Sequence, residues 1–237
     1  MPGKIRPEAA VVVLAGGSGA RLGAAVNKVY LPLAGRRVIS WSFARARDVA
    51  GIGRFLLVVR PGDEDLAAAV LAEDLPGLPV ELVPGGATRH ESEQAALDRL
   101  AGQVAAGEIR VIAIHDGARP LAGTDLFRSV LATAAEVGGA LPAVPAGAVL
   151  PIGDGDPVTG GGRLVRVQTP QAFRATELLA AYEAARAAGH QGTDTAGSVR
   201  AFSDLDVRVV AGSRWNIKIT YPEDLATAER LLSRLPP

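Results

Sequence analysis

Short runs of apolar residues alternate along the chain with longer amphipathic stretches. The runs are rich in Val, Leu and Ile and are apolar almost throughout, which is typical of parallel strands buried on both faces. They predict strands at residues 9–14, 55–60, 80–83, 111–115, 140–144 and 207–210. The amphipathic stretches predict helices at residues 39–49, 63–73, 88–100, 125–137, 175–188, 193–200 and 222–235. This alternation indicates the α/β class, with a doubly wound, mostly parallel sheet and right-handed crossovers.

One segment, residues 145–168, interrupts the alternation. It has few helix signals and is rich in glycine. We expect it to leave the sheet as a protruding β-arm, with two short strands near residues 149–152 and 164–167. No repeat, low-complexity tract or linker divides the chain, so the prediction is one domain, residues 1–237, that carries this arm.

Charge and composition exclude several classes of protein. The 237 residues include 25 basic and 25 acidic side chains, so the formal net charge is zero, whereas nucleic-acid binding normally shows as a basic excess. The absence of cysteine excludes disulfides and a cysteine nucleophile, and three widely spaced histidines argue against a zinc site. No apolar run approaches the roughly 18 residues that span a bilayer, and the first residues lack the apolar stretch of a signal peptide. We therefore expect a cytoplasmic protein without a nucleic-acid or membrane partner.

The first motif is a glycine-rich segment, residues 14–23, which follows the first predicted strand directly. It therefore lies at the carboxyl edge of the sheet, where open α/β sheets bind ligands. No Gly-Lys pair is present for a Walker loop, and Leu22 stands where a dinucleotide fingerprint needs glycine. Glycines allow consecutive backbone N–H groups to approach an anion closely. The segment predicts a phosphate-binding loop, with Arg21 and Lys28 as its cations.

The second motif, residues 114–120, ends a predicted buried strand. Asp116 is placed there to meet a divalent metal or a ribose hydroxyl, although an Asx turn would explain the same residue. His115 points inward along the strand, so we expect it to pack in the core rather than to act as a base.

The third motif contains Lys218, one of only three lysines beside 22 arginines. It lies in segment 216–220, which we expect to be a short strand, and an edge-strand lysine that discourages aggregation remains an alternative to a catalytic one. The chain thus offers cations, glycine amides and one acid at a strand end. This set is typical of phosphoryl or nucleotidyl transfer, where positioning and charge neutralisation carry most of the catalysis.

Seven motifs occur together in one order: the glycine-rich loop, followed by residues 27–28, 85–89, 115–120, 168–171, 193–194 and 216–220. With them the chain, from Ala10 to Leu232, resembles the 2-C-methyl-D-erythritol 4-phosphate cytidylyltransferases of isoprenoid biosynthesis. That family belongs to the Rossmann-like nucleotidyltransferases with a glycosyltransferase-A-like fold. The resemblance implies transfer of a cytidylyl group from CTP to a polyol phosphate, release of pyrophosphate, and Mg²⁺ as the divalent cation. It also implies a homodimer in which the arm embraces the second subunit.

The resemblance further implies a role for each matching residue. The catalytic residues would be Arg21, Lys28 and Lys218. The nucleotide-binding residues would be Ala15, Gly16, Gly17, Ser18, Gly19, Gly86 and Ser92. The acceptor-binding residues would be Asp116, Arg119, Thr169 and Thr193. Asp116 would also be the metal ligand, beside the CTP phosphates that hold most of the metal.

Four places depart from the family's pattern. Ala87 stands where an acidic residue is frequent, and Asn27 stands where proline usually precedes the lysine. Gly147-Ala148 stands where an Asp-Thr pair is expected, and Gly161 where an arginine is expected. The last two changes concern the acceptor, because the missing threonine and arginine normally touch methylerythritol phosphate.

There are three alternatives to the family's default function. Within the same chemistry, the acceptor would be another alditol phosphate, such as ribitol 5-phosphate. In another class, the chain would be a nucleotide-binding paralogue without activity, but a mere binder would not need both Lys28 and Lys218. An NAD-dependent oxidoreductase is disfavoured by the failed fingerprint.

Overall fold

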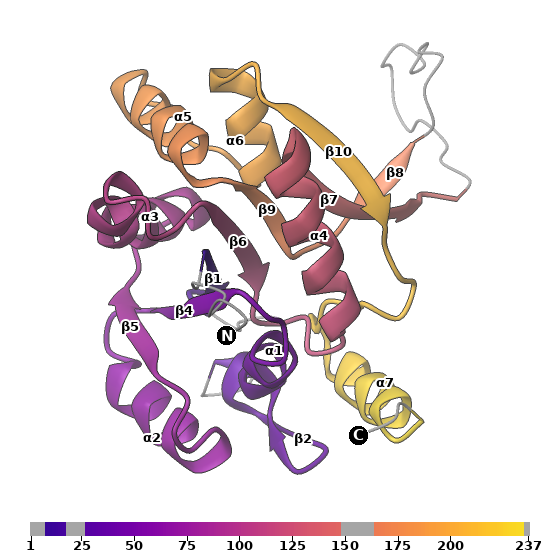
Figure 1. Cartoon of the computed structure of the whole chain (residues 1–237). Coiled ribbons are helices and arrows are strands. Elements are labelled where there is room, and N and C mark those ends of the chain that lie inside the picture. Colours follow the sequence, from indigo (N-terminus) through magenta and orange to yellow (C-terminus); the bar gives the residue numbers. More distant parts are fainter. Residues whose placement is uncertain (1–7, 18–26, 148–163, 235–237) are drawn as a thin grey trace, which may run out of the picture.

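The computed structural model describes residues 8–17, 27–147 and 164–234. Within these residues, eight strands form one sheet in the order β10-β7-β9-β6-β1-β4-β5, and β8 pairs with β7 (Figure 1). The strands are β1 (Ala9–Leu14), β4 (Ile52–Val59), β5 (Val80–Pro84), β6 (Val111–Asp116), β7 (Gly138–Pro145), β8 (Val165–Val167), β9 (Gln171–Arg174) and β10 (Asp206–Ala211).

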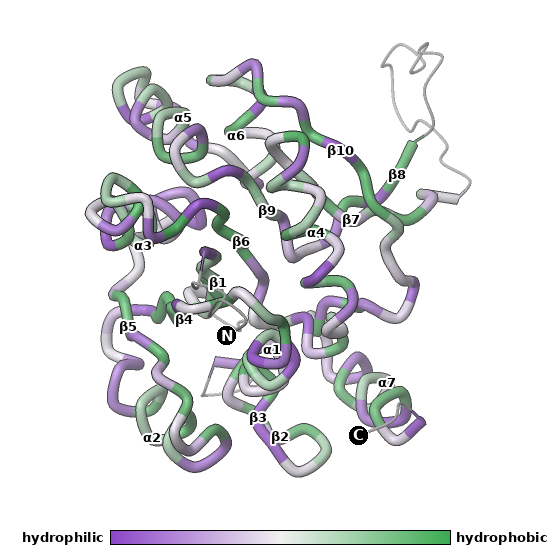
Figure 2. Tube along the Cα trace, viewed as in Figure 1, coloured by the Kyte–Doolittle hydropathy of each residue, from purple (hydrophilic) through white to green (hydrophobic). Residues whose placement is uncertain are grey.

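Helices cover both faces of the sheet because its central strands are apolar on both sides. Along β1, Val11 and Val13 join one core while Ala10 and Val12 join the other. The first core packs against α1 (Val38–Ala46), α2 (Glu64–Asp74) and α4 (Thr124–Val137). The second packs against α3 (Arg89–Ala105), α5 (Ala175–Ala187) and α6 (Thr195–Phe202). Figure 2 shows β6 largely green, whereas purple and green alternate along α3. The expected doubly wound α/β fold is confirmed.

A smaller cluster closes the lower end of the molecule in the view of Figure 1. There α7 (Pro222–Leu232) packs Ala228 and Leu232 against Leu33 and Ile219. Leu33 belongs to a hairpin of β2 (Pro32–Leu33) and β3 (Arg36–Arg37), which follows the 3₁₀ helix η2 (Lys28–Tyr30). Among the described residues, no helix is both long and apolar enough to cross a bilayer.

Three segments differ from the sequence-based prediction or extend it. β9 was not expected, and it runs antiparallel between β6 and β7. Residues 216–220 are not a strand, because their pairing is limited to isolated contacts such as Ile219 N donating to Ala118 O at 2.8 Å. At the base of the expected arm, β8 pairs antiparallel with β7, while the first expected arm strand lies outside the described residues.

The strand order creates a switch point beside β1. The chain passes from β1 to β4 and β5 on one side, and β6 pairs with β1 on the other side. Both pairs are parallel, and Leu14 at the end of β1 faces Asp116 at the end of β6. Ligands of open α/β sheets bind in the crevice at such a point. The fold therefore brings the first and second sequence motifs to one place.

Candidate active site

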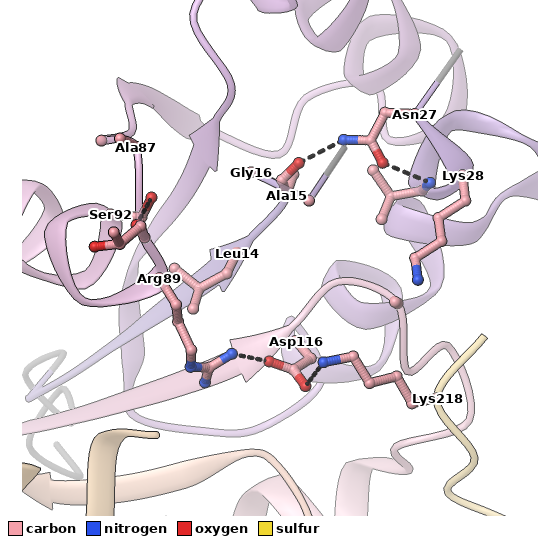
Figure 3. A pocket seen from close by; sticks show the side chains of 15 residues that line it. Leu14, Ala15, Gly16, Asn27, Lys28, Ala87, Arg89, Ser92, Asp116 and Lys218 are labelled. Carbon is pink, nitrogen blue, oxygen red and sulfur yellow. Dashed lines mark hydrogen bonds and ion pairs between the residues drawn. The ribbon is translucent and has the colours of Figure 1, made fainter. Parts of the chain in front are cut away.

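A cavity of about 440 Å³ opens at the carboxyl ends of β1 and β6 (Figure 3). Its volume lies within the range of small-molecule sites in proteins. It is lined by Leu14, Ala15, Gly16, Gly17, Asn27, Lys28, Val29, Gly86, Ala87, Thr88, Arg89, Ser92, Asp116, Ala118 and Lys218.

The wall that follows β1 consists mainly of backbone and one lysine. Ala15, Gly16 and Gly17 continue the strand without side chains that would fill the cavity. Asn27 locks this wall, since its Nδ2 donates to Ala15 O at 2.6 Å and its Oδ1 accepts from Val29 N at 3.4 Å. Because Asn27 caps η2, it also fixes Lys28, which is only 8% exposed and whose side chain points into the cavity (Figure 3).

The opposite wall is the start of α3. Thr88 and Glu91 form the capping box that their spacing predicts, and Glu91 Oε2 also accepts from Ala87 N at 2.7 Å. The chain passes so close to Glu91 at Gly86 that a Cβ there would overlap Glu91 Cβ. Ser92 is buried and donates from its hydroxyl to Thr88 O at 2.9 Å. This wall therefore presents backbone and small side chains at the start of a helix, where the capping box takes up the amides of Ala87, Thr88 and Glu91.

Asp116 forms the floor, surrounded by cations from three elements. Its Oδ1 pairs with Arg89 Nη1 at the start of α3, and its Oδ2 accepts from Lys218 Nζ at 2.9 Å. Arg119 Nε lies 3.5 Å from the same Oδ2. Burial alone would raise the pKa of Asp116, but the charges of Arg89 and Lys218 outweigh it and hold the pKa well below its usual range. Figure 3 shows Arg89 and Lys218 reaching the carboxylate from opposite sides.

A second set of contacts supports Asp116 from behind. Thr169 Oγ1 accepts from Asp116 N at 3.0 Å and lies 3.0 Å from His115 Nδ1. His115 Nε2 lies 3.2 Å from Arg119 O. His115 is fully buried, as expected of a core histidine, and burial lowers its pKa to about 4. Asn216 Nδ2 donates to Thr169 O at 2.9 Å, which ties the segment before Lys218 to the same support.

The donor set of the cavity suits phosphate groups. Backbone amides, Lys28 and the cations around Asp116 surround one space that is large enough for a nucleotide. Among the described residues, no three His, Cys, Asp or Glu side chains gather as a metal site. Asp116 supplies one carboxylate, whose oxygens already pair with Arg89 and Lys218, so a Mg²⁺ ion that arrives on phosphates and keeps several waters would share this carboxylate with them.

A model of the 2-C-methyl-D-erythritol 4-phosphate cytidylyltransferase family matches residues 9–234. The chain belongs to this family. A protein of that name from Cereibacter sphaeroides is 44% identical over 232 residues, which cover 94% of this chain and 96% of the relative. Another, from Synechococcus sp., is 34% identical over 231 residues, covering 94% and 97%.

Solved structures agree with this assignment. The 4-diphosphocytidyl-2C-methyl-D-erythritol synthase of Anaerococcus prevotii superimposes with a TM-score of 0.80 at 29% identity, over 96% of both chains. The 2-C-methyl-D-erythritol 4-phosphate cytidylyltransferase of Thermus thermophilus gives a TM-score of 0.69 at 31% identity, over 94% of this chain and 98% of that one. The family membership and the nucleotidyltransferase fold expected from the sequence are thus confirmed, and the chain is a cytidylyltransferase.

The predicted site residues of this cytidylyltransferase fall into three groups. Those that line the cavity are Ala15, Gly16, Gly17, Lys28, Gly86, Ser92, Asp116 and Lys218. Arg119 and Thr169 support Asp116 instead of lining the cavity, and Thr193 is exposed just before α6. Ser18, Gly19 and Arg21 lie outside the described residues. The roles assigned to all these residues stay predictions.

Sequence reasoning gave no role to Arg89 or Glu93. Arg89 stood in one of the motifs, but its partner Asp116 is 27 positions away, and helix spacing alone does not reveal such a contact. Glu93 follows Arg89 by four positions, which is the spacing of neighbours on one helix face. That spacing was the available signal for their ion pair.

Proposed function

We propose that this cytidylyltransferase joins CTP to 2-C-methyl-D-erythritol 4-phosphate, giving a CDP-polyol and pyrophosphate in isoprenoid biosynthesis. The observation that carries the proposal is the single cavity that holds Lys28 on one wall and the Asp116–Lys218 pair on its floor. This arrangement leaves room for both substrates, and membership of the family supports the same reaction. It also argues against a paralogue that has lost its activity.

The reaction is an in-line substitution at phosphorus. A phosphate oxygen of the acceptor attacks the α-phosphorus of CTP, forming a new P–O bond while the bond from the α-phosphorus to the β-phosphate oxygen breaks. Pyrophosphate leaves with the electron pair of that bond. Negative charge accumulates on the oxygens of the α-phosphorus, so Lys28 and Arg21 would stabilise the transition state more than the bound substrate.

We assign the nucleotide to the two walls of the cavity. The backbone of residues 15–19 would bind the triphosphate, and the N-terminus of α3, with Gly86 and Ser92, would bind the base. Ala87 carries no acidic group, so selection of cytosine would rest on the backbone amides and carbonyls of this wall.

We assign the acceptor phosphate to the floor, where Lys218 would contact it directly. Asp116 would hold Lys218 in place and contact the ribose or the acceptor hydroxyls. Arg119 and Thr169 would act through Asp116, since both contact it from outside the cavity lining. Thr193 would contact the acceptor from the loop that precedes α6.

Mg²⁺ is the cofactor that this proposal requires. It would be held mostly by the CTP phosphates, with Asp116 as the protein ligand. When bound, it neutralises phosphate charge during the transfer.

We further propose a cytoplasmic homodimer whose subunits are single domains, residues 1–237, joined through the arm at 145–168. The base of the arm supports this, because Leu164, Val165 and Val167 on the arm side and Val209 on β10 are exposed apolar residues. Sedimentation at micromolar concentration should show a dimer, and deletion of residues 154–162 should weaken it. A monomeric intact protein would contradict the proposal.

The experiment that tests the reaction is pyrophosphate release over a panel of substrates. CTP with 2-C-methyl-D-erythritol 4-phosphate should be turned over best, and ATP, GTP or UTP should replace CTP poorly. Ribitol 5-phosphate serves as the matched acceptor that shares the phosphate and the polyol chain. Preferred turnover of ribitol 5-phosphate would reassign the acceptor, and no turnover of any polyol phosphate would contradict the whole proposal.

A further inference from the structure

A buried carboxylate, Glu93, lies behind the cavity wall and takes no part in the reaction described above. Glu93 is 1% exposed and follows Arg89 by one turn of α3. Two hydroxyls from other helices donate to it. Thr195, the first residue of α6, donates from Oγ1 to Glu93 Oε1 at 2.7 Å, and Tyr182 of α5 donates to Glu93 Oε2. Three helices thus meet at one carboxylate.

Glu93 also contacts the arginine that reaches the cavity floor. Its Oε1 lies 3.1 Å from Arg89 Nε as an ion pair without a hydrogen bond, so Glu93 acts on the guanidinium through its charge. The other end of the same guanidinium pairs through Nη1 with Asp116 Oδ1, and Asp116 Oδ2 accepts from Lys218 Nζ at 2.9 Å. A continuous set of polar contacts therefore runs from the helix interface to Lys218 on the floor.

A gain in folding stability does not explain why a carboxylate is buried at this position. Burying a carboxylate is costly, and replacing a buried ion pair by apolar residues of similar volume is often neutral or stabilising. Orientation gives a better reason. An arginine side chain has many rotamers, and a guanidinium held only at Asp116 could rotate about that contact. With the charge of Glu93 beside its Nε as well, Arg89 meets Asp116 at Oδ1 and leaves Oδ2 to Lys218.

We propose that Glu93 is a positioning residue for the acceptor half of the site, acting through Arg89 on Asp116 and Lys218. Thr195 and Tyr182 hold Glu93 in the conformation that reaches Arg89. The inference rests on the proposed function of the cavity floor as the acceptor site. It extends that function to a residue that touches neither substrate.

Three variants test the role without leaving a buried hydroxyl unpaired. The double variant Tyr182→Phe/Thr195→Val removes both hydroxyls that hold Glu93, so a partial loss of acceptor kcat/KM is expected from it. The triple variant, which adds Glu93→Leu, makes the same interface apolar and removes the contact with Arg89. Glu93→Gln keeps the side-chain size and hydrogen-bonding groups for Thr195 and Tyr182, but it removes the charge that faces Arg89. Ser40→Ala is the stability control, because Ser40 donates to Asp74 at 2.7 Å between α1 and α2, away from the cavity lining.

The readouts are kcat/KM for 2-C-methyl-D-erythritol 4-phosphate and the Kd of CTP measured without acceptor. Relative to the wild type, the triple variant should lose about tenfold or more in kcat/KM for the acceptor, because a misplaced floor impairs a step that depends on orientation. Its Kd for CTP should stay within about twofold, and Glu93→Gln should show a similar loss in kcat/KM, because it removes the charge that attracts Arg89.

Two results would overturn the role. One is a triple variant with the same acceptor kcat/KM as the wild type. The other is a loss that appears equally in the Kd of CTP, or that Ser40→Ala reproduces, which would indicate a general loss of structure. Turnover by the wild type is read separately: an inactive wild type refutes the proposed function, whereas an active wild type with unchanged variants refutes only the role of Glu93.

Discussion

Two parts of the cavity hold their charge in different ways: the wall that follows β1, called the first wall here, and the floor around Asp116, called the second wall. On the β1 side, backbone groups and Lys28 are fixed mainly by one amide, since Asn27 bonds to Ala15 O and caps η2. On the second wall, Asp116 at the end of β6 is placed by side chains from α3 and the segment before α7, with Thr169 behind it. The first wall follows from the local chain, whereas the second depends on residues far apart in the sequence. A substitution on the first wall should therefore act on one step, and a substitution on the second should also affect stability.

The largest effect should come from Lys28. Lys28→Ala should lower kcat by about 10²–10³ and change CTP binding little, because charge at the α-phosphorus develops mainly in the transition state. Lys28→Arg should fail as well, since the planar guanidinium cannot replace a point charge at a site that is 8% exposed. Pyrophosphate release at saturating substrates measures both variants. Near wild-type turnover by Lys28→Arg would contradict the proposal that Lys28 acts as a point charge on the transition state.

The next effect should come from Asp116, on the second wall. Asp116→Asn leaves the charges of Arg89, Arg119 and Lys218 without their common carboxylate. We expect a loss of roughly 3–5 kcal/mol in the free energy of unfolding, as when one partner of a buried pair is removed. We also expect a fall of about 10–100-fold in kcat/KM for the acceptor. Urea unfolding and steady-state kinetics test the two parts, and an unchanged stability would show that the cations do not depend on Asp116.

The support of the second wall should also make stability depend on pH. Burial lowers the pKa of His115 to about 4, from about 6.5 in the unfolded chain, so the unfolded state binds the extra proton between these values. The contribution of neutral His115 is therefore complete above pH 6.5 and is lost as the pH falls to 4, by about 3 kcal/mol. Asp116 remains ionised through this window, because Arg89 and Lys218 hold its pKa well below its usual range despite burial.

The measurement is the free energy of unfolding of wild type and His115→Gln between pH 7.5 and 4. The wild type should lose stability more steeply as the pH falls, and the variant should lack the part that belongs to His115. Parallel curves would show that His115 does not titrate as its burial requires.

The smallest effect should come from Asn27, on the first wall. Asn27→Ala removes the hydrogen bond from Nδ2 to Ala15 O and the cap of η2. This should destabilise the bound conformation of the first wall by about 1 kcal/mol. We expect CTP to bind about fivefold more weakly, with acceptor KM unchanged. Calorimetric titration with CTP measures the change. A larger change in the KM of the acceptor than in the Kd of CTP would contradict the assignment of Asn27 to the first wall.

The sequence predicted the parts of the molecule that local patterns determine. All seven expected helices are present, and the glycine-rich loop and Asp116 lie together because they end neighbouring parallel strands. β9 was missed, since four residues after Thr169-Pro170 carry no clear alternation. The segment 216–220 was predicted as a strand from its β-branched residues. It is not a strand, and the side chains of Asn216 and Lys218 bond to Thr169 and Asp116 instead.

The candidate site divides in the same way. Lys28 and the glycine amides could be found from their motif, because backbone and adjacent residues form that wall. The pairing of Arg89 with Asp116, and of Glu93 with Tyr182 and Thr195, joins elements that only the folded chain brings together. A glutamate in a polar helix reads as a surface residue, so its burial could not be anticipated from sequence.

The difference between the two walls is tested most directly by Lys28→Ala and Lys218→Ala measured side by side, with CTP and 2-C-methyl-D-erythritol 4-phosphate both varied. We predict that Lys28→Ala lowers kcat with little change in acceptor KM, because Lys28 acts on the transition state. Lys218→Ala should raise acceptor KM by about tenfold or more, because it removes a cation from the acceptor phosphate. An equal fall in kcat in both variants, or an equal rise in acceptor KM, would contradict the division of the cavity into a transfer wall and an acceptor floor.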